Sequence, residues 1–467
     1  MTAFASAFPV PVSTVPAVPG VPLLGNLLQF RKDRLALQDL AARTAPMARL
    51  QLAHLPIYVV TDAEIAREVL VEKAEQFTKS AALAFLKPML GDGLLTAEGE
   101  THRRHRKLLA PAFAPKRLAA YGEVMVAETE AQVARWRAGD RIDIAGEMMQ
   151  MTLAIAGRTL FSADVRGDAD AVARGLELGM RAQVESLLAV IRLGYNWPLP
   201  RHLRMRKAVA ILDEVVYRLI REGRARGTDR GDVLSILLLA RDEDDVDRSE
   251  PLGTGAHLTA PAGGLSDAQV RDEVMTLLLA GHETTANALT WTWYELGRNP
   301  AALARLTAEL DEVLGDRAPT ADDLPRLPWN LAAIEEAMRL HPPAYAIGRE
   351  STGALELGGH RLPAGAVVLL NIRGIHRRAD YFRDPEAFLP ERMLEAAKKA
   401  RPRHHYLPFG AGPRVCIGSH FALLEAQLAL ATMAHRVRLR PLAAVVLPEP
   451  LVTLRPRGGM PAVVELR

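Results

Sequence analysis

Apolar residues recur at helical spacing along most of this chain. The period predicts amphipathic helices over the ranges 101–113, 117–137, 145–160, 168–192, 204–226, 231–240, 302–315, 330–341 and 418–436. Alternating apolar and polar residues predict a hairpin over 47–60 and short strands near 354–371 and 445–467. The fold class indicated is mainly α, with small β-sheets at one side.

The longest helical pattern covers residues 266–298. It begins with Ser266 and Gln269 at the spacing of a capping box, and Thr61 and Glu64 repeat this spacing ahead of a shorter helix. At about 1.5 Å per residue, the long helix would cross most of a domain. We therefore expect it to be central and buried.

Two stretches depart from the helical pattern. Residues 1–30 form a proline-rich N-terminal segment, and residues 241–264 are first acidic and then rich in Gly and Pro, as expected of an exposed loop. The sequence shows no repeat period and nothing that resembles a flexible linker between domains. We therefore predict a single domain over residues 1–467.

Composition and charge narrow the class of protein. The chain has 49% hydrophobic and 24% charged residues, and its 58 Lys and Arg nearly balance 55 Asp and Glu, so we expect a globular protein that binds no nucleic acid. A single Cys excludes an intrachain disulfide and fits a reducing compartment. No basic signal region occurs in residues 1–30, and no apolar run approaches the roughly 20 residues that span a bilayer. The expectation is a cytoplasmic monomer without a membrane anchor.

The lone cysteine, Cys416, lies in the segment FGAGPRVCIG, directly before an amphipathic helix. Backbone N–H groups and the dipole at a helix start stabilise a thiolate. Gly410, Gly412 and Gly418 would let a flat cofactor approach the backbone, and Arg414 could pair with an anionic group on it.

Two other interpretations of Cys416 stay open on this reasoning. A cysteine without context is most often a buried, inert thiol. A cysteine nucleophile needs a base, for which His404 and His405 are available. A nucleotide-binding loop is a poor match, because the segment has no Gly-Lys-Ser/Thr.

The cysteine segment resembles the haem-ligand signature of the cytochrome P-450 superfamily, Phe-x-x-Gly-x-Arg-x-Cys-x-Gly. Its fixed positions are filled by Phe409, Gly412, Arg414, Cys416 and Gly418. The resemblance implies a mostly helical, prism-like fold and a haem b whose iron takes the Cys416 thiolate as its axial ligand. It also implies a monooxygenase that inserts one atom of dioxygen into a lipophilic molecule, since the thiolate favours cleavage of the oxygen–oxygen bond.

A second motif, AGHETT, begins at Ala280 within the longest predicted helix. Taken alone, Thr284 is expected to bond back to the carbonyl of Ala280 without a chemical role. The motif also matches the superfamily's pattern Ala/Gly-Gly-x-Asp/Glu-Thr. The resemblance implies that Ala280 and Gly281 lie against the haem with room for dioxygen. It further implies that Glu283 supplies protons that Thr284 delivers.

A third and a fourth motif match elsewhere. Glu336 and Arg339 lie three apart on a predicted helix, and FLPERM supplies Arg392. By resemblance these three form a buried ionic network under the haem loop, with a structural role.

The segment HRRHR places His102 and Arg106 four residues apart, a version that resembles soluble bacterial enzymes. By resemblance both bind the haem propionates, together with Arg349 and Arg414. For Arg103, Arg104, His105 and Lys107, a solvated face stays an open interpretation.

Electrons are expected to come from other proteins, because no flavin or nicotinamide domain fits in the remaining sequence. We expect a ferredoxin or flavodoxin with its reductase. A basic docking patch for such a carrier would comprise Lys107, Lys116, Arg117, Lys398, Lys399, Arg401 and Arg403.

The substrate pocket is placed by resemblance alone. Its expected residues are Phe85, Leu86, Met89, Leu187, Leu188, Leu277, Ala344, Ile347, Leu451 and Val452, each of which could equally be core. Fatty acyl chains are the first expectation, followed by terpenoids, steroids, macrolides and drug-like molecules. Two other functions are weighed: a peroxide-driven peroxygenase, which has less need of Glu283 and Thr284, and a non-catalytic haem gas sensor.

Overall fold

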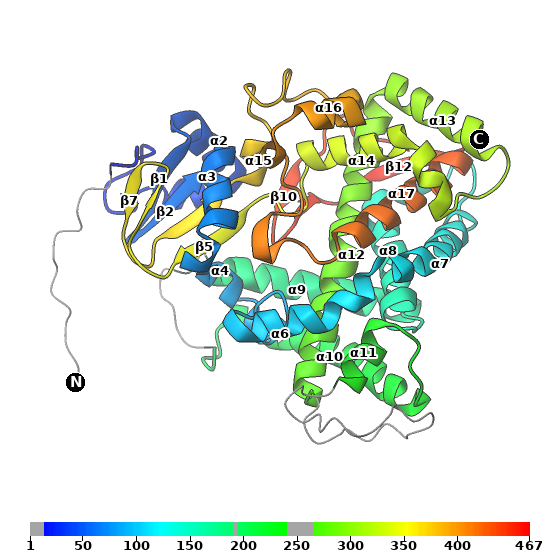
Figure 1. Ribbon diagram of the computed structural model, residues 1–467, viewed down its shortest axis with the longest axis horizontal. Helices are drawn as coiled ribbons and strands as arrows, with labels where there is room; N and C mark the ends of the chain where they lie inside the picture. The colour runs from blue at the N-terminus through cyan, green and yellow to red at the C-terminus, as the bar shows by residue number, and fades with distance from the viewer. Residues whose placement is uncertain (1–13, 188, 190–194, 241–264) are drawn as a thin grey trace. The chain divides into compact units, whose positions relative to one another are not determined.

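The computed structural model describes residues 14–187, 189, 195–240 and 265–467 (Figure 1). The loop expected at 241–264 and the first 13 residues of the proline-rich segment lie outside the described residues. Contacts divide the chain into two compact units. The β-rich unit comprises Met1–Ser80, Ala346–Ile375 and Ala411–Arg414, and the helical unit comprises Ala81–Tyr345, His376–Gly410 and Val415–Arg467. The number of domains stays a prediction.

A five-stranded sheet forms the centre of the β-rich unit. Its strands follow the order β1 (Met47–Leu52), β2 (Leu55–Val60), β8 (Val367–Leu370), β5 (Ile347–Ser351) and β3 (Phe77–Lys79). The β2–β8 pair is parallel, and the other pairs are antiparallel. The sheet is accompanied by α1 (Leu27–Lys32), α2 (Arg34–Thr44), α3 (Ala63–Arg67), α15 (Ile372–Ile375) and the hairpin of β6 (Leu355–Leu357) and β7 (His360–Leu362). Strands β1 and β2 confirm the hairpin predicted over 47–60.

The capping box predicted at Thr61 is wrong by one residue. The side chain of Asp62 caps α3, because its Oδ1 accepts hydrogen bonds from the backbone N–H groups of Glu64 at 2.9 Å and Ile65 at 3.1 Å. The Thr61 hydroxyl instead donates to the carbonyl of Pro46 at 3.3 Å. A carboxylate at the N-cap position is the stronger acceptor near the positive end of a helix.

Helices dominate the other unit, and the predicted helical ranges are confirmed to within a few residues. They are α4 (Ala81–Ala84), α5 (Lys87–Leu90), α6 (Gly99–Leu109), α7 (Pro115–Val133), α8 (Ile144–Leu160), α9 (Ala169–Leu187), α10 (Pro200–Arg226), α11 (Val233–Leu239), α12 (Asp267–Arg298), α13 (Pro300–Leu314), α14 (Pro328–Leu340), α16 (Glu395–Ala400) and α17 (Ser419–Arg436). Two small sheets join them: β4 (Arg141–Asp143), β12 (Pro461–Leu466) and β9 (Val437–Pro441), and the pair β10 (Pro448–Pro450) and β11 (Leu454–Pro456).

The long helix α12 is central to the helical unit, as predicted. Its capping box is complete: Gln269 N donates to Ser266 Oγ at 3.3 Å, and Ser266 N donates to Gln269 Oε1 at 2.9 Å. Helices α8, α14, α10 and α17 pack against it (Figure 1). Nearly every residue between Val270 and Leu296 is buried, so the few that are not stand out. Within the described residues, no helix has both the length and the apolar character needed to span a bilayer.

Candidate active site

Cys416 lies at the end of a tight loop, three residues before α17 begins. Its backbone N–H donates to the carbonyl of Phe409 at 3.0 Å, which closes the loop, and the thiol side chain is exposed. Desolvation among surrounding protein atoms raises the pKa of the Cys416 thiol, whereas a hydrogen bond from Gly418 and the charge of Arg106 oppose this rise. An accessible sulfur with a backbone donor and a cation beside it fits a metal-bound thiolate, because coordination to a cation removes the thiol proton.

The glycines of this loop have different explanations. Gly410 and Gly412 have φ angles of 70° and 71°, which side chains disfavour, and a Cβ on Gly412 would lie 1.8 Å from the carbonyl oxygen of Leu70. A Cβ on Gly418 would meet only a Phe113 ring carbon, at the ordinary distance of 3.7 Å. Backbone geometry therefore gives Gly410 and Gly412 an explanation that Gly418 lacks, and close approach of a cofactor stays a prediction for all three.

Arg106 binds the cysteine loop directly. Its Nη1 donates to the carbonyl of Val415 at 2.8 Å, one residue before Cys416. His102, one turn earlier on α6, is buried. The structure therefore places Arg106 next to the proposed ligand, and the contact of both residues with haem propionates stays a prediction.

The other two residues predicted to bind propionates belong to the β-rich unit. Arg414 Nη1 donates to the carbonyl of Ala74 at 3.2 Å, and Arg349 Nη1 donates to the carbonyl of Gly348 at 3.0 Å. The role of Arg414 and Arg349 toward a haem stays a prediction.

The middle of α12 has an accessible face. Ala280 is exposed and Gly281 and Thr284 are partly exposed, between neighbours that are buried. Positions i, i+1 and i+4 share one side of a helix. Thr284 Oγ1 donates to the carbonyl of Ala280 at 3.0 Å, as expected from its hydroxyl. The AGHETT motif thus presents a small, apolar surface with one hydroxyl at its edge.

Glu283 points away from that face toward β11. Its carboxylate is buried and accepts from Arg455 Nε at 2.9 Å and from the Thr453 hydroxyl. Sequence reasoning missed Arg455, which lies 172 positions further along the chain. The structure therefore gives Glu283 a structural ion pair, and the expected proton supply to Thr284 requires that pair to open.

His282, between the accessible and the buried parts of the motif, is a hydrogen-bonding residue. Its Nδ1 lies 2.5 Å from the carbonyl oxygen of Leu278, and desolvation by burial lowers the pKa of the imidazole. The neutral imidazole of His282 therefore donates from Nδ1 to a carbonyl of its own helix and packs in the protein interior.

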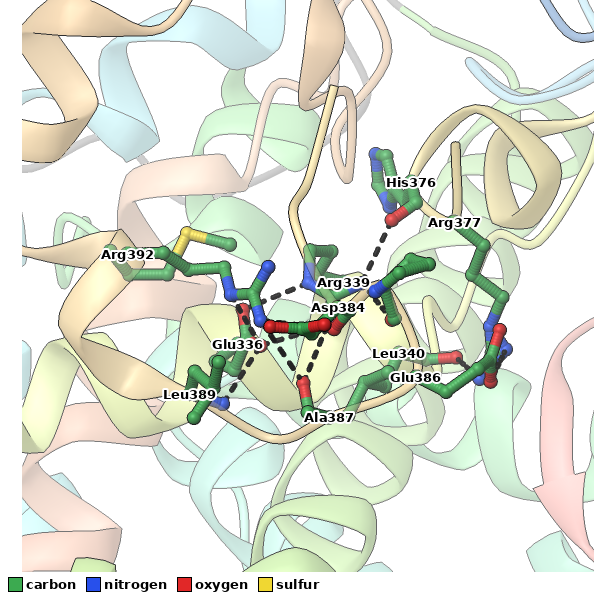
Figure 2. A network of polar contacts seen from close by, with 12 residues as sticks. Glu336, Arg339, Leu340, His376, Arg377, Asp384, Glu386, Ala387, Leu389 and Arg392 are labelled. Carbon is green, nitrogen blue, oxygen red and sulfur yellow. Dashed lines mark hydrogen bonds and ion pairs between the residues drawn. The ribbon is translucent and has the colours of Figure 1, made fainter. Parts of the chain in front are cut away.

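The structure brings Glu336, Arg339 and Arg392 together (Figure 2). Arg339 binds Glu336 through two nitrogens at 2.8 and 2.9 Å, and Arg392 Nε lies 3.1 Å from the same carboxylate. Arg339 also donates to the backbone carbonyls of His376, Pro385 and Ala387. Burial raises the pKa of Glu336, and both arginines oppose this rise. Arg339 is fully enclosed by protein atoms, so the cluster holds separate segments of the chain together and has a structural role.

His376 connects this cluster to the cysteine loop. Burial and the charges of Arg339 and Arg401 lower the pKa of His376 well below its usual value, so the ring is neutral at pH 7. Its unprotonated Nε2 accepts a hydrogen bond from the backbone N–H of Leu407 at 2.8 Å, two residues before Phe409. The loop before Cys416 is thereby tied to α14 through His376 and Arg339.

The residues predicted to line the substrate pocket divide into three groups. Leu86, Met89 and Leu277 are buried in the main core of the helical unit. Leu188 lies outside the described residues, and the others are partly exposed: Phe85, Leu187, Ala344, Ile347, Leu451 and Val452. The partly exposed residues fit a contact role better than the buried three do, and pocket membership stays a prediction for all of them.

Comparison with known proteins identifies the family. The model of the cytochrome P450 family matches residues 16–460. Cyclooctatin synthase from Streptomyces melanosporofaciens is 40% identical over 94% of this chain and 92% of its own length, and cyclooctat-9-en-7-ol 5-monooxygenase from the same organism is 36% identical over 98% and 96%. Pentalenene oxygenase from Streptomyces avermitilis is 33% identical over 90% and 89%.

A solved structure agrees with the fold class predicted from the sequence. The crystal structure of the cytochrome P450DA heme domain superposes with a TM-score of 0.84, at 26% identity, covering 97% of this chain and 98% of that one. The chain belongs to the cytochrome P450 family of haem-thiolate monooxygenases.

Proposed function

We propose that this monooxygenase hydroxylates or epoxidises a cyclic terpenoid. The observation that carries the proposal is a set of relatives that match at least nine-tenths of this chain, two of which are named for cyclooctat-9-en-7-ol and pentalenene. These names specify unsaturated hydrocarbon skeletons with few or no polar groups. Terpenoids, second among the classes expected from the sequence, therefore move ahead of fatty acids.

The accessible residues of α12 suit such a substrate. Ala280 and Gly281 present little surface for hydrogen bonding, and Thr284 contributes a single hydroxyl. An apolar skeleton gains binding free energy from leaving water, and it leaves no buried polar group unpaired at such a surface. Such a surface would distinguish one apolar skeleton from another by its shape.

The roles of the site residues follow from their positions. When bound through Cys416, the haem would supply oxygen activation, and the Gly418 N–H would stabilise the thiolate. Thr284 would hold a proton at Oγ1, and Glu283 would supply it after releasing Arg455. Arg106 and His102 would bind the propionates.

We also propose that a ferredoxin or flavodoxin, with its reductase, delivers the electrons. Lys107, Lys116 and Arg403 are exposed and can contribute to a basic docking patch. Arg401 is a poor candidate for that patch, because it lies over the rings of Phe382 and Tyr406, and burial lowers the pKa of its guanidinium group. Turnover of the purified chain with NADPH alone would contradict this proposal.

Fatty acyl oxidation is the second candidate. Leukotriene-B4 omega-hydroxylase 3 from Mus musculus is 32% identical over 87% of this chain. Its name specifies oxidation at the end of a substrate, a regiochemistry that a long flexible chain permits. The two candidate substrate classes differ in shape, since a terpenoid of this kind is a cyclic skeleton and a fatty acid is a long flexible chain.

Substrate-induced change in the haem spin state tests the two candidates. Cyclic terpenoid alkenes and alkenols, and fatty acids of increasing length, are titrated into the holoenzyme while the Soret band is recorded. The proposal predicts saturable spin shifts with cyclic terpenoids at lower concentrations than with any fatty acid, and oxygenated products when redox partners are added. Tighter binding and faster oxidation of fatty acids would contradict it.

A further inference from the structure

A buried contact between His105 and Glu273 joins α6 to α12. His105 Nδ1 lies 2.6 Å from Glu273 Oε1, and the side chains are only 3% and 1% exposed. The solvated face left open for His105 by the sequence is therefore wrong, because the imidazole is enclosed by protein. In the described part of the chain, neither oxygen of Glu273 accepts a hydrogen bond, and the approach of His105 Nδ1 is the polar contact that this carboxylate makes.

The sequence of α6 explains why the helix needs such a contact. Residues Gly99–Leu109 read GETHRRHRKLL, and the two leucines lie together at the C-terminal end. Apolar packing, which includes the packing of α11 against α6, is non-directional. Separation of two buried polar groups would leave each of them without its polar neighbour in the protein interior, so their contact can restrict the rotation of α6 about its own axis.

The rotation of α6 decides where its neighbouring polar residues point. His105 lies three residues after His102 and one before Arg106, and positions three and four apart share a helix face. Arg106 reaches the carbonyl of Val415, next to Cys416. A turn of α6 that broke the His105 contact would also withdraw Arg106 from the cysteine loop.

We propose that His105 is a positioning residue for the haem site. Through Glu273 it fixes α6 against α12, and thereby holds Arg106 on the Val415 carbonyl and directs His102 and Arg106 toward the haem propionates. The inference rests on the proposed propionate role of His102 and Arg106. It assigns His105 no contact with substrate or cofactor.

A second histidine–glutamate contact to α12 supplies a control. His341 Nε2 lies 2.8 Å from Glu295 Oε1, with side chains 12% and 8% exposed, and the ring of His341 stacks on Trp291. This pair is also a histidine–glutamate contact to α12, and its histidine directly follows α14 instead of lying on α6.

The experiment compares purified holoenzyme variants at a temperature well below the Tm of each. Two properties are measured: the rate of haem transfer to apomyoglobin, and the fraction of thiolate-type Soret band in the reduced carbon monoxide spectrum. For His105→Ala we expect haem transfer about tenfold faster, the order of effect found when the support of a metal site is removed, and a smaller thiolate-type band. His105→Asn, whose amide keeps a donor near the position of Nδ1, should recover most of both. His341→Ala should lower the Tm and leave both properties near wild type.

The outcomes separate this inference from the proposal on which it rests. Faster haem transfer in Arg106→Ala with wild-type behaviour in His105→Ala and Glu273→Gln would overturn the positioning role. Wild-type haem transfer in Arg106→Ala, in His102→Ala and in His105→Ala would overturn the propionate assignments. Equal losses in His105→Ala and His341→Ala would show general destabilisation and also overturn the inference. If His105→Ala fails to fold, His105→Asn and Glu273→Gln give the same comparison.

Discussion

Two buried glutamate–arginine contacts in this protein have opposite surroundings. At Glu336, the partner Arg339 is fully enclosed and donates to three backbone carbonyls as well as to the carboxylate. At Glu283, the partner Arg455 is partly exposed, and the next residue, Thr284, borders the accessible face of α12. A glutamate–arginine pair thus joins secondary structure in one place and lies beside the proposed reacting region in the other. Substitutions at the two places should therefore affect different properties.

The largest expected effect is loss of stability at the enclosed pair. Arg339→Ala removes two hydrogen bonds to the buried Glu336 carboxylate and three to backbone carbonyls, and should cost about 3–5 kcal/mol in the free energy of unfolding. Denaturant unfolding of the purified variant measures it. The surface pair Arg440–Glu465 supplies the control, since Arg440→Ala should cost at most about 1 kcal/mol. Similar costs in the two variants would contradict the structural role of the enclosed pair.

The next effect concerns catalysis beside Glu283. Thr284→Ala removes the proposed proton donor and should lower product formation about 100-fold, while reductant is still consumed. The free energy of unfolding should change little, because within the described part of the chain the hydroxyl bonds only to the carbonyl of Ala280 in its own helix. Thr292→Ala is the control, since the Thr292 hydroxyl makes the same bond to Ala288 at 2.7 Å but is buried. Product formation close to wild type in Thr284→Ala would rule out the relay.

The smallest effect concerns a third buried carboxyl, which lacks an arginine partner among the described residues. Burial raises the pKa of Glu425 on α17 well above 4.5, and the hydroxyl of Thr285 opposes this rise only in part. The native state therefore binds a proton that the unfolded state releases, so stability should fall as pH rises from 4.5 toward the raised pKa.

Replacement of the Glu425 carboxyl tests the predicted direction of this pH dependence of stability. Glu425→Gln should lose that decline and gain stability at neutral pH, as measured by Tm between pH 4.5 and 8. Glu465→Gln, at an exposed position, should keep the wild-type slope. A steeper decline with rising pH in Glu425→Gln would show that the buried carboxylate is stabilising.

The sequence predicted features that depend on nearby residues and missed those that depend on distant ones. The capping box of α12 and the Cys416 loop are local patterns, and both were predicted from a few neighbouring residues. Arg455 and Glu283 are 172 positions apart, so no spacing rule links them. His105 belongs to a segment of cations that looks solvated, and only the three-dimensional structure shows that it is buried against Glu273.

The central claim is that Cys416 is the axial ligand, and one spectrum tests it most directly. The reduced carbon monoxide difference spectrum is recorded for the wild type and for Cys416→Ser, each reconstituted with haem. The account predicts a thiolate-type Soret band in the wild type and its complete loss in the variant. A thiolate-type band that persists in Cys416→Ser, the chain's single cysteine having been removed, would contradict it.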